Sequence, residues 1–382
     1  MLPIPPAVLA ALGQATARPV RAEWSNDGGQ TWAPCRFGAG NVTPDRTAEV
    51  RYSAAVELLD APRGRDGINS ISTRIRLHQG LGTPRRDTVW IPAGVYVIDR
   101  LTRTRLGVSL DLLGLEEIVR GDSFPVARTV GPDTAKVCAE QLVAESLPGQ
   151  AIAWRAGVDP QLTLPAVVVD QDRWAALSGG DDSAGASTGI APAVAAEVYL
   201  DARGVPTFAP VPSLTDPVVW RIPRGLATAE PAYEESTDNL INLWSVTGDA
   251  GDGSTPVGPV YAWDDDPNSL TYAGPDPVSD PSAPARLGLR GVRVRSARYS
   301  SALITTATQG QDVANAQLAD SLGVQSTLSF TAVCNPALEP GDVVELEITD
   351  GVWERHLIDS CPYTLGGVSM TCQTRTTTRK GA

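Results

Sequence analysis

Histidine is scarce in this 382-residue chain, which has only His78 and His356. Two histidines so far apart exclude a histidine-rich metal centre and disfavour acid–base chemistry that depends on imidazole. No serine or cysteine stands at a spacing from either histidine that would indicate a catalytic triad. We therefore expect no catalytic residues and no metal-binding residues.

Paired cysteines are also lacking. The five cysteines are odd in number, widely spaced and without any C-x-x-C pair, which is typical of reduced, buried thiols in a protein made in a cytosol. They are Cys35, Cys138, Cys334, Cys361 and Cys372.

Long apolar runs are absent. No stretch approaches the roughly 18 apolar residues that a membrane span needs, so we expect no stable membrane insertion. Residues 1–17 lack a basic segment and contain three prolines, which argues against a signal peptide. We expect an N-terminal arm there, with a short helix at about 6–14.

Positive charge is in deficit. The chain has 31 Lys and Arg against 44 Asp and Glu, a net charge of −13. An acidic protein repels phosphate backbones, so general nucleic-acid binding is not expected. The Gly38-x-Gly40 segment lacks the helix and lysine of a phosphate-binding loop, and no cofactor is predicted.

Turn-forming residues are plentiful, with 36 glycines and 31 prolines. Turn residues between short segments of alternating apolar and polar residues predict a mainly β, α+β protein rather than a helical bundle. We expect two tube-like antiparallel β-barrel domains flanking mixed α/β middle domains. The expected limits are 1–17 for the arm, 18–130 for the first barrel, 131–230 for a mixed domain, 231–290 for a small β/loop domain, and 291–382 for a second barrel that includes a helix.

An internal repeat supports two barrels. Residues 96–99 (Tyr-Val-Ile-Asp) align with 356–359 (His-Leu-Ile-Asp) at an offset of 260 residues, and Gly-Val-Ser follows at 107–109 and 367–369. A Ser-Thr pair precedes each copy, at Ser72 and at Ser326. The pattern predicts two related β domains; two unrelated hairpins with generic turns are the alternative.

Ser25–Trp32 fits the pattern S-x-D-x-G-x-T-W, in which Asp and Ser brace a hairpin turn over a tryptophan. One copy predicts a braced hairpin and not a glycosidase propeller. The nine tryptophans are spread along the chain and are expected mostly in the core; a glycan-stacking surface is the alternative.

Several charged segments could carry chemistry. The oxygen-rich segments 249–254 and 264–266 lack EF-hand spacing, so solvated loops are expected, with a calcium site as the alternative. Glu116-Glu117 and Glu234-Glu235 are adjacent carboxylates, which a strand would point to opposite faces, so we expect solvent-facing charge. The basic clusters are either solvated strand faces or contacts with an acidic edge of a neighbouring subunit. These clusters are Arg85-Arg86, Arg100–Arg105 and Arg286–Arg298.

Four segments together resemble a known family: 172–177 with 196–201, 264–272, 300–309, and 335–344, which contains the string Pro-Ala-Leu-Glu-Pro-Gly-Asp. Over about residues 18–375 the chain resembles tail proteins of actinobacterial phages and prophages, known mostly as a domain of unknown function. That family is similar to the baseplate hub proteins of tailed phages and contractile injection systems. The insert at 178–190 departs from it, where an unbroken helix would be expected.

The resemblance implies a non-enzymatic structural protein at the tail tip of a virion, assembled in the host cytoplasm. It implies a homotrimeric hub that closes the tail tube and adapts six-fold tube symmetry to three-fold tip components. The implied partners are the tail tube or distal tail protein, a spike or fibre protein below, and a tape measure protein, with DNA passing through the lumen unbound. The alternatives are a carbohydrate-binding receptor-recognition module and, after it, a cell-wall hydrolase.

Overall fold

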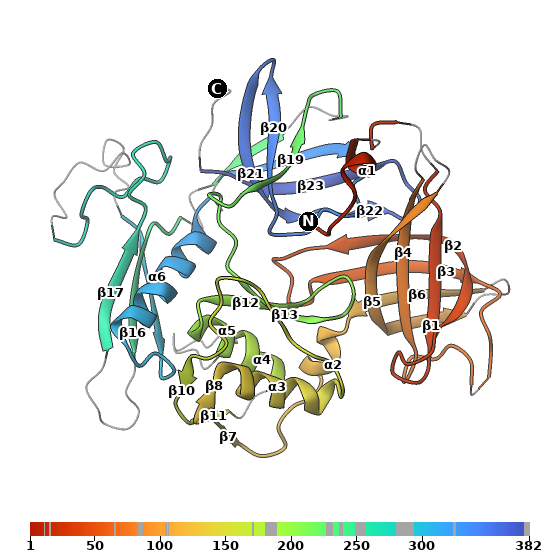
Figure 1. The fold of residues 1–382 in the computed structure, drawn as a ribbon, viewed down its shortest axis with the longest axis horizontal. Helices are drawn as coiled ribbons and strands as arrows, with labels where there is room; N and C mark the ends of the chain where they lie inside the picture. Colours follow the sequence, from red (N-terminus) through yellow and green to blue (C-terminus); the bar gives the residue numbers. More distant parts are fainter. Residues whose placement is uncertain are drawn as a thin grey trace.

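The computed structural model describes residues 1–377 except 11, 15–16, 65, 83–86, 104, 106, 170–171, 180–188, 227–231, 237–239, 249–256, 280–293 and 324–325. The segment 249–254, the pair Arg85-Arg86, and most of the clusters at 178–190 and 286–298 therefore lie outside the described residues. Strands dominate the fold and helices are few, which confirms the predicted fold class (Figure 1).

The first barrel is a closed six-stranded sheet in the order β1-β4-β5-β6-β3-β2, with β2 pairing back to β1. Side chains alternate between buried and exposed along β3, as expected where one face of a sheet is covered. Leu58, Ile75, Leu77, Tyr96 and Leu110 are among the fully buried side chains. The strands are β1 (Val20–Ser25), β2 (Ala33–Pro44), β3 (Tyr52–Leu59), β4 (Arg74–Gly82), β5 (Thr88–Arg103) and β6 (Gly107–Gly114).

A second six-stranded sheet follows the same plan, in the order β14-β20-β21-β23-β19-β15. Taken in chain order, its six strands occupy the places of β1, β2, β3, β4, β5 and β6 of the barrel. They are β14 (Val218–Ile222), β15 (Ala232–Glu235), β19 (Ser326–Val333), β20 (Val343–Thr349), β21 (Val352–Ser360) and β23 (Ser369–Arg375).

The two sheets differ in the direction of one strand. β14 is parallel to β20, whereas β1 is antiparallel to β4. This reversal makes β14 parallel to β15, and the connection between them is shorter than the crossover that adjacent parallel strands need. No pairing between β14 and β15 occurs among the described residues, and a hydrogen bond from Val333 N to Leu226 O bridges this side of the sheet.

The predicted repeat falls on equivalent strands, β5 and β21. In β5 the pairing with β6 shifts register between Ile98 and Arg100, and in β21 the pairing with β23 shifts between Ile358 and Ser360. Asp99 and Asp359 therefore lie at the same irregularity, which supports two related domains over two unrelated hairpins.

Two flanking parts of the repeat were aligned wrongly. Val108 is buried inside β6, but Val368 lies in the turn before β23 and is 69% exposed. The short strand β22 (Tyr363–Thr364) lies between β21 and β23 and displaces the equivalent residues. The strand after Ser72 is β4, whose counterpart is β20 and not the strand that begins at Ser326.

The middle of the chain forms a helical layer with short strands. α2 (Glu116–Arg120), α3 (Ala135–Ser146), α4 (Arg173–Ser178) and α5 (Ile190–Ala193) pack around their own core. Beside them lies a three-stranded sheet in the order β12-β13-β9. The remaining elements are β7 (Arg128–Val130), β8 (Asp133–Thr134), β9 (Ala153–Trp154), β10 (Thr163–Leu164), β11 (Val167–Val169), β12 (Ala196–Leu200) and β13 (Pro206–Pro210).

A small unit consists of β16 (Leu243–Gly248), β17 (Val257–Trp263), β18 (Ser296–Ser301) and α6 (Ala307–Ser321). β18 and α6 were expected in the second barrel, but β18 pairs with β16 and α6 packs against β16 and β17. This unit is inserted in the chain between β15 and β19. β14 and β15 therefore precede it in the sequence and pair with strands that follow it. Short edge strands carry too little pattern for sequence analysis to place them in a distant sheet.

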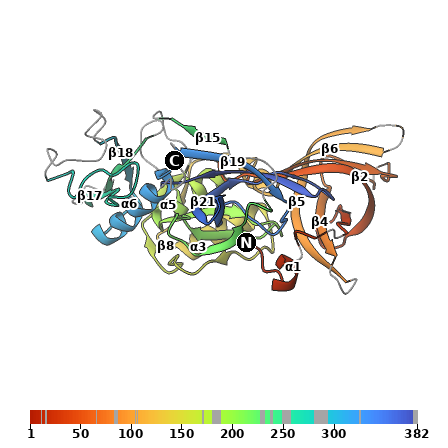
Figure 2. The same ribbon diagram turned by 90° about the horizontal axis from the view of Figure 1, so that it is seen from above.

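The two large sheets are joined edge to edge. The second half of β2 runs along residues 359–365, with Asn41 opposite Thr364 and Val42 opposite Tyr363. Further bonds run from Cys361 N to Pro44 O, from Leu365 N to Gly40 O and from Arg46 N to Asp359 O. The sheets therefore form one continuous surface, seen from above in Figure 2.

The N-terminal arm packs against this surface. Its helix, α1 (Pro6–Ala10), is shorter than expected, and Val8 and Leu12 are buried in the main core. Of the described helices, none has both the length and the apolar character to span a membrane.

Gly94→Ala should disrupt the first barrel. Gly94 has φ +141°, and an added Cβ would lie 2.1 Å from Tyr96, a fully buried side chain whose hydroxyl donates to Ala93 O at 2.5 Å. We expect several kcal/mol of destabilisation, or no soluble protein. Gly28→Ala is the control, because Gly28 has φ +75° with no atom near the added Cβ and should cost only about 1–2 kcal/mol. Equal denaturation midpoints for the two variants would contradict this account.

Candidate functional site

The two histidines lie in separate environments. His78 Nδ1 is 3.9 Å from the Glu23 carboxylate on the barrel, and burial lowers the pKa of His78. His356 is fully buried in the second sheet, where its Nδ1 is 3.1 Å from the Thr374 hydroxyl and its Nε2 is 3.6 Å from Glu354. The Thr374 hydroxyl that His356 contacts is itself buried, and it lies 3.2 Å from the backbone carbonyl of Leu328, to which it donates.

The segment Ser25–Trp32 forms the predicted braced hairpin. The Asp27 carboxylate accepts hydrogen bonds from Gln30 N, Thr31 N and the Thr31 hydroxyl, and Ser25 Oγ donates to it at 2.7 Å. The bonds from Thr31 and Ser25 lower the pKa of Asp27 well below its ordinary value. The hydrogen bonds of the Asp27 carboxylate therefore all lie within the turn.

Two acidic residues, Glu116 and Asp264, are buried where solvent-facing charge and a solvated loop were expected. Glu117 is partly exposed and bonds Arg120, but Glu116 is 1% exposed, so the prediction of solvent-facing charge is wrong for Glu116. Asp264 is also buried, and it accepts hydrogen bonds from Ser269 and Thr271 within its own turn. Among the residues that the structure describes, no cluster of acidic, cysteine or histidine side chains could hold a metal ion.

All nine tryptophans lie in the described part of the chain. Only Trp174 and Trp220 are buried and the other seven are partly exposed, so the prediction that most lie in the core is wrong. Arginine guanidinium groups cover three of the partly exposed rings, with Arg21 over Trp90, Arg76 over Trp32 and Arg221 over Trp353. Such contacts stabilise the fold and cover one face of each of these three rings.

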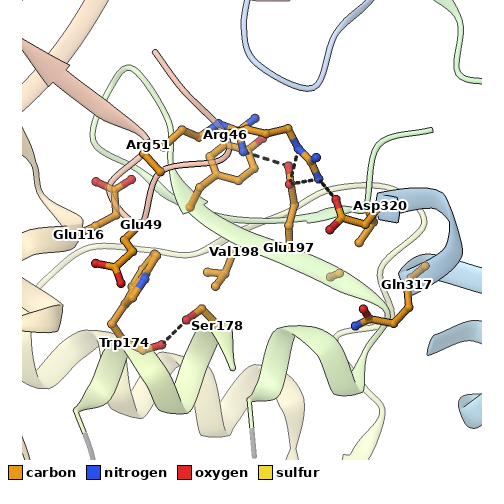
Figure 3. A pocket seen from close by; sticks show the side chains of 15 residues that line it. Arg46, Glu49, Arg51, Glu116, Trp174, Ser178, Glu197, Val198, Gln317 and Asp320 are labelled. Carbon is orange, nitrogen blue, oxygen red and sulfur yellow. Dashed lines mark hydrogen bonds and ion pairs between the residues drawn. The ribbon is translucent and has the colours of Figure 1, made fainter. Parts of the chain in front are cut away.

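Several charged side chains meet at a junction that the sequence did not indicate (Figure 3). A polar cavity of about 220 Å³ lies where the β2–β3 loop meets α4, β12 and α6. The loop supplies Arg46 and Arg51, β12 supplies Glu197, and α6 supplies Asp320. The first barrel, the middle layer and the small unit therefore meet at one point.

Glu197 is the centre of this junction. Its Oε2 accepts from Arg46 at 3.1 and 3.3 Å, and its Oε1 accepts from Arg51 at 3.0 Å. Arg46 also reaches Asp320 at 2.9 Å. Both guanidinium groups are nearly buried, with side-chain exposures of 6% and 7%. Because water hardly reaches them, the Glu197 carboxylate compensates their positive charge.

Arg51 extends the junction to the second sheet by donating to Pro340 O. Its guanidinium stacks on the Tyr199 ring at 3.7 Å. Burial alone would lower the pKa of Arg51, but the Glu197 carboxylate together with Tyr199 and Tyr52 outweighs burial and raises the pKa above its ordinary value. Arg375 completes the set, bonding Asp359 at 2.6 Å and the backbone carbonyl of Asp320.

This arrangement joins domains, and Glu116, whose pKa is raised by burial, also lines the cavity. Each buried arginine has a carboxylate partner, and the contacts fix the relative positions of four parts of the chain. No local motif could reveal it, because Arg46 and Glu197 are 151 residues apart. Within its own segment each of these charges looks like an ordinary surface residue, so the sequence carries no signal for the junction.

No protein-family model matches the chain, and no curated protein matches it. Solved structures do match along nearly the whole length. A tail protein from Neisseria meningitidis MC58 has 14% identity and a TM-score of 0.59, covering 94% of this chain and 96% of that one. The prophage tail protein gp18 from Listeria monocytogenes EGD-e has 11% identity and a TM-score of 0.55, covering 95% of each chain.

The 43 kDa tail protein of prophage MuSo2 from Shewanella oneidensis has 12% identity and a TM-score of 0.53, covering 93% of this chain and 98% of that one. At such low identities the likeness shows a shared fold. The architecture described above is therefore shared with tail proteins from three different bacteria.

Glu197→Gln should strongly destabilise the protein. The substitution leaves two buried guanidinium groups with only Asp320 as a charged partner, which costs about 3–5 kcal/mol. The control is Glu117→Gln, whose carboxylate is 38% exposed and pairs with Arg120, and which should cost less than about 1 kcal/mol. Urea denaturation followed by tryptophan fluorescence measures both. Similar midpoints would mean that water replaces the Glu197 contacts.

Glu116→Gln should change how stability depends on pH. Glu116 Oε1 accepts from Leu200 N at 3.0 Å, and burial raises the pKa of Glu116 from its ordinary 4.5 to about 7. The protonated form therefore stabilises the fold at low pH, and this contribution is lost as pH rises from 4.5 through 7. Glutamine mimics the protonated acid at every pH. The free energy of unfolding of the variant minus that of the wild type should rise between pH 5 and pH 8 by up to about 3 kcal/mol. A difference that does not change with pH would contradict the assignment.

Proposed function

We propose that this chain is a structural, non-enzymatic protein of a phage tail, where it forms the baseplate hub at the tail tip. The observation that carries the proposal is the full-length likeness to three tail proteins, with 93–95% of this chain covered. A match of this extent includes both large sheets, the middle layer and the inserted unit together. A shared barrel alone would cover much less of the chain.

The two sheets of one plan support a role in symmetry adaptation. Three copies, each with two similar sheets, present six similar edges to a six-fold tail tube and three-fold features on the opposite side. In this proposal the hub is a homotrimer that contacts the tail tube or distal tail protein above and a spike or fibre protein below. A tape measure protein would lie in or above its opening.

The net charge of −13 suits a ring through which DNA passes without binding, because phosphates are repelled by acidic surfaces. The protein would be assembled in the host cytoplasm and carried in the virion. The covered tryptophans give no support to a carbohydrate-binding module, and the separate histidines and committed carboxylates give none to a cell-wall hydrolase.

Negative-stain electron microscopy of the purified protein, alone and with purified tail tube, tests the proposal. We expect a three-fold ring with six similar lobes and an open centre, formed alone or on the tube as template. A ring of five or seven copies would overturn symmetry matching. A compact monomer that does not bind the tail tube would overturn the hub role itself.

A further inference from the structure

The junction between the two sheets within one chain provides a template for contacts between chains. Residues 41–44 of β2 form an unusual edge, because β1 pairs only with residues 33–35 of that strand. The edge is filled by the other sheet: Val42 lies opposite Tyr363, Asn41 opposite Thr364, and Asp45 forms a bridge with Ser360.

β15 is the counterpart of this β2 edge in the second sheet. The ladders fix the correspondence, because Thr43 lies opposite Ser53 on β3, whereas Glu234 lies opposite Thr327 on β19. Ser53 and Thr327 are equivalent, since they lie opposite Leu113 and Arg375 on the equivalent strands β6 and β23. Glu234 therefore takes the place of Thr43. The only described strand that pairs with β15 is β19.

The counterpart of residues 359–365 in the barrel is the second half of β5. Arg100 lies opposite Asp111 and Ser360 opposite Gln373, each directly after the shared register shift, so Arg100 corresponds to Ser360. β4 pairs with β5 only as far as Val97. The edge of residues 99–103 that faces away from β6 therefore has no described strand beside it.

We propose that β15 of one copy pairs, antiparallel, with residues 100–103 of β5 in a second copy. The internal junction sets the register, which places Glu234 opposite Thr102 and Ser236 opposite Arg100. The contact is head-to-tail, so repeated rotation closes a ring in which every junction between sheets is alike, whether within or between chains. This inference rests on the proposed hub function and adds to it the surface that joins the subunits.

Charge on the two edges is complementary. Glu234 and Glu235 are exposed on β15, and Arg100, Arg103 and Arg105 are exposed at the end of β5. Arg100 is 76% exposed, and its nearest carboxylate in the same chain, that of Asp111, is 4.0 Å away. Opposed carboxylates and arginines favour the pairing of these edges and disfavour pairing of two like edges.

Disulfide cross-linking tests the register. In a Cys35→Ser background, which removes the one cysteine that is not buried, we would make Glu234→Cys with Thr102→Cys. Directly opposed residues on paired antiparallel strands come within disulfide reach. Mild oxidation should give covalent trimers of the double variant, and a covalent dimer when the two single variants are mixed.

Two matched pairs control the geometry. Arg103→Cys points to the other face of β5, and Ser109→Cys lies on β6 opposite Thr102, one strand further from the proposed edge. Neither should cross-link efficiently with Glu234→Cys. Stronger cross-linking through either one than through Thr102→Cys would overturn the register.

Charge reversal tests the energetics separately. Glu234→Lys with Glu235→Lys should weaken self-association at least about tenfold, and combining it with Arg100→Glu and Arg103→Glu should restore it. A normal three-fold ring in the reversed variant, together with no cross-link in the Glu234→Cys, Thr102→Cys double variant, would overturn this pairing and leave the hub proposal standing. The cross-link in rings of another order would support the pairing and overturn the trimeric hub. Absence of both the ring and the cross-link, with purified tail tube present, would overturn both proposals.

Discussion

The fold depends on one run of backbone hydrogen bonds, between the second half of β2 and residues 359–365. It joins two sheets that are far apart in sequence into one surface, since Val42 and Tyr363 face each other across it. It also fixes the start of the β2–β3 loop, because Arg46 N bonds Asp359 O. That loop then delivers Arg46 and Arg51 to Glu197, so the charged junction is a consequence of how the sheets are joined.

The features that the sequence could predict are those whose causes are local. The braced hairpin at Ser25–Trp32 depends on residues within one turn, and the shared Ile-Asp at 98–99 and 358–359 marks one irregularity in two equivalent strands. The inserted unit was not predictable in this way. β15 is a four-residue strand, and nothing in Ala-Tyr-Glu-Glu reveals that its partner β19 begins at Ser326.

The junction escaped prediction for a related reason. Arg46, Glu197 and Asp320 come from three separate segments, and each looks like an ordinary surface charge in its own sequence context. Their burial is a property of the assembled domains. The arginines that cover Trp32, Trp90 and Trp353 likewise form contacts between separate segments of the chain.

The insertion between β15 and β19 also sets an order of events during synthesis. All six barrel strands lie between Val20 and Gly114, so the barrel can close early, whereas β14 and β15 emerge from the ribosome before any strand that they pair with. Completing the second sheet requires closing a loop as long as the whole small unit, and loops of that kind slow folding. The newly made chain therefore carries an unsatisfied pair of strands until its C-terminal segment is translated, and this interval is when misassociation between nascent chains is most costly.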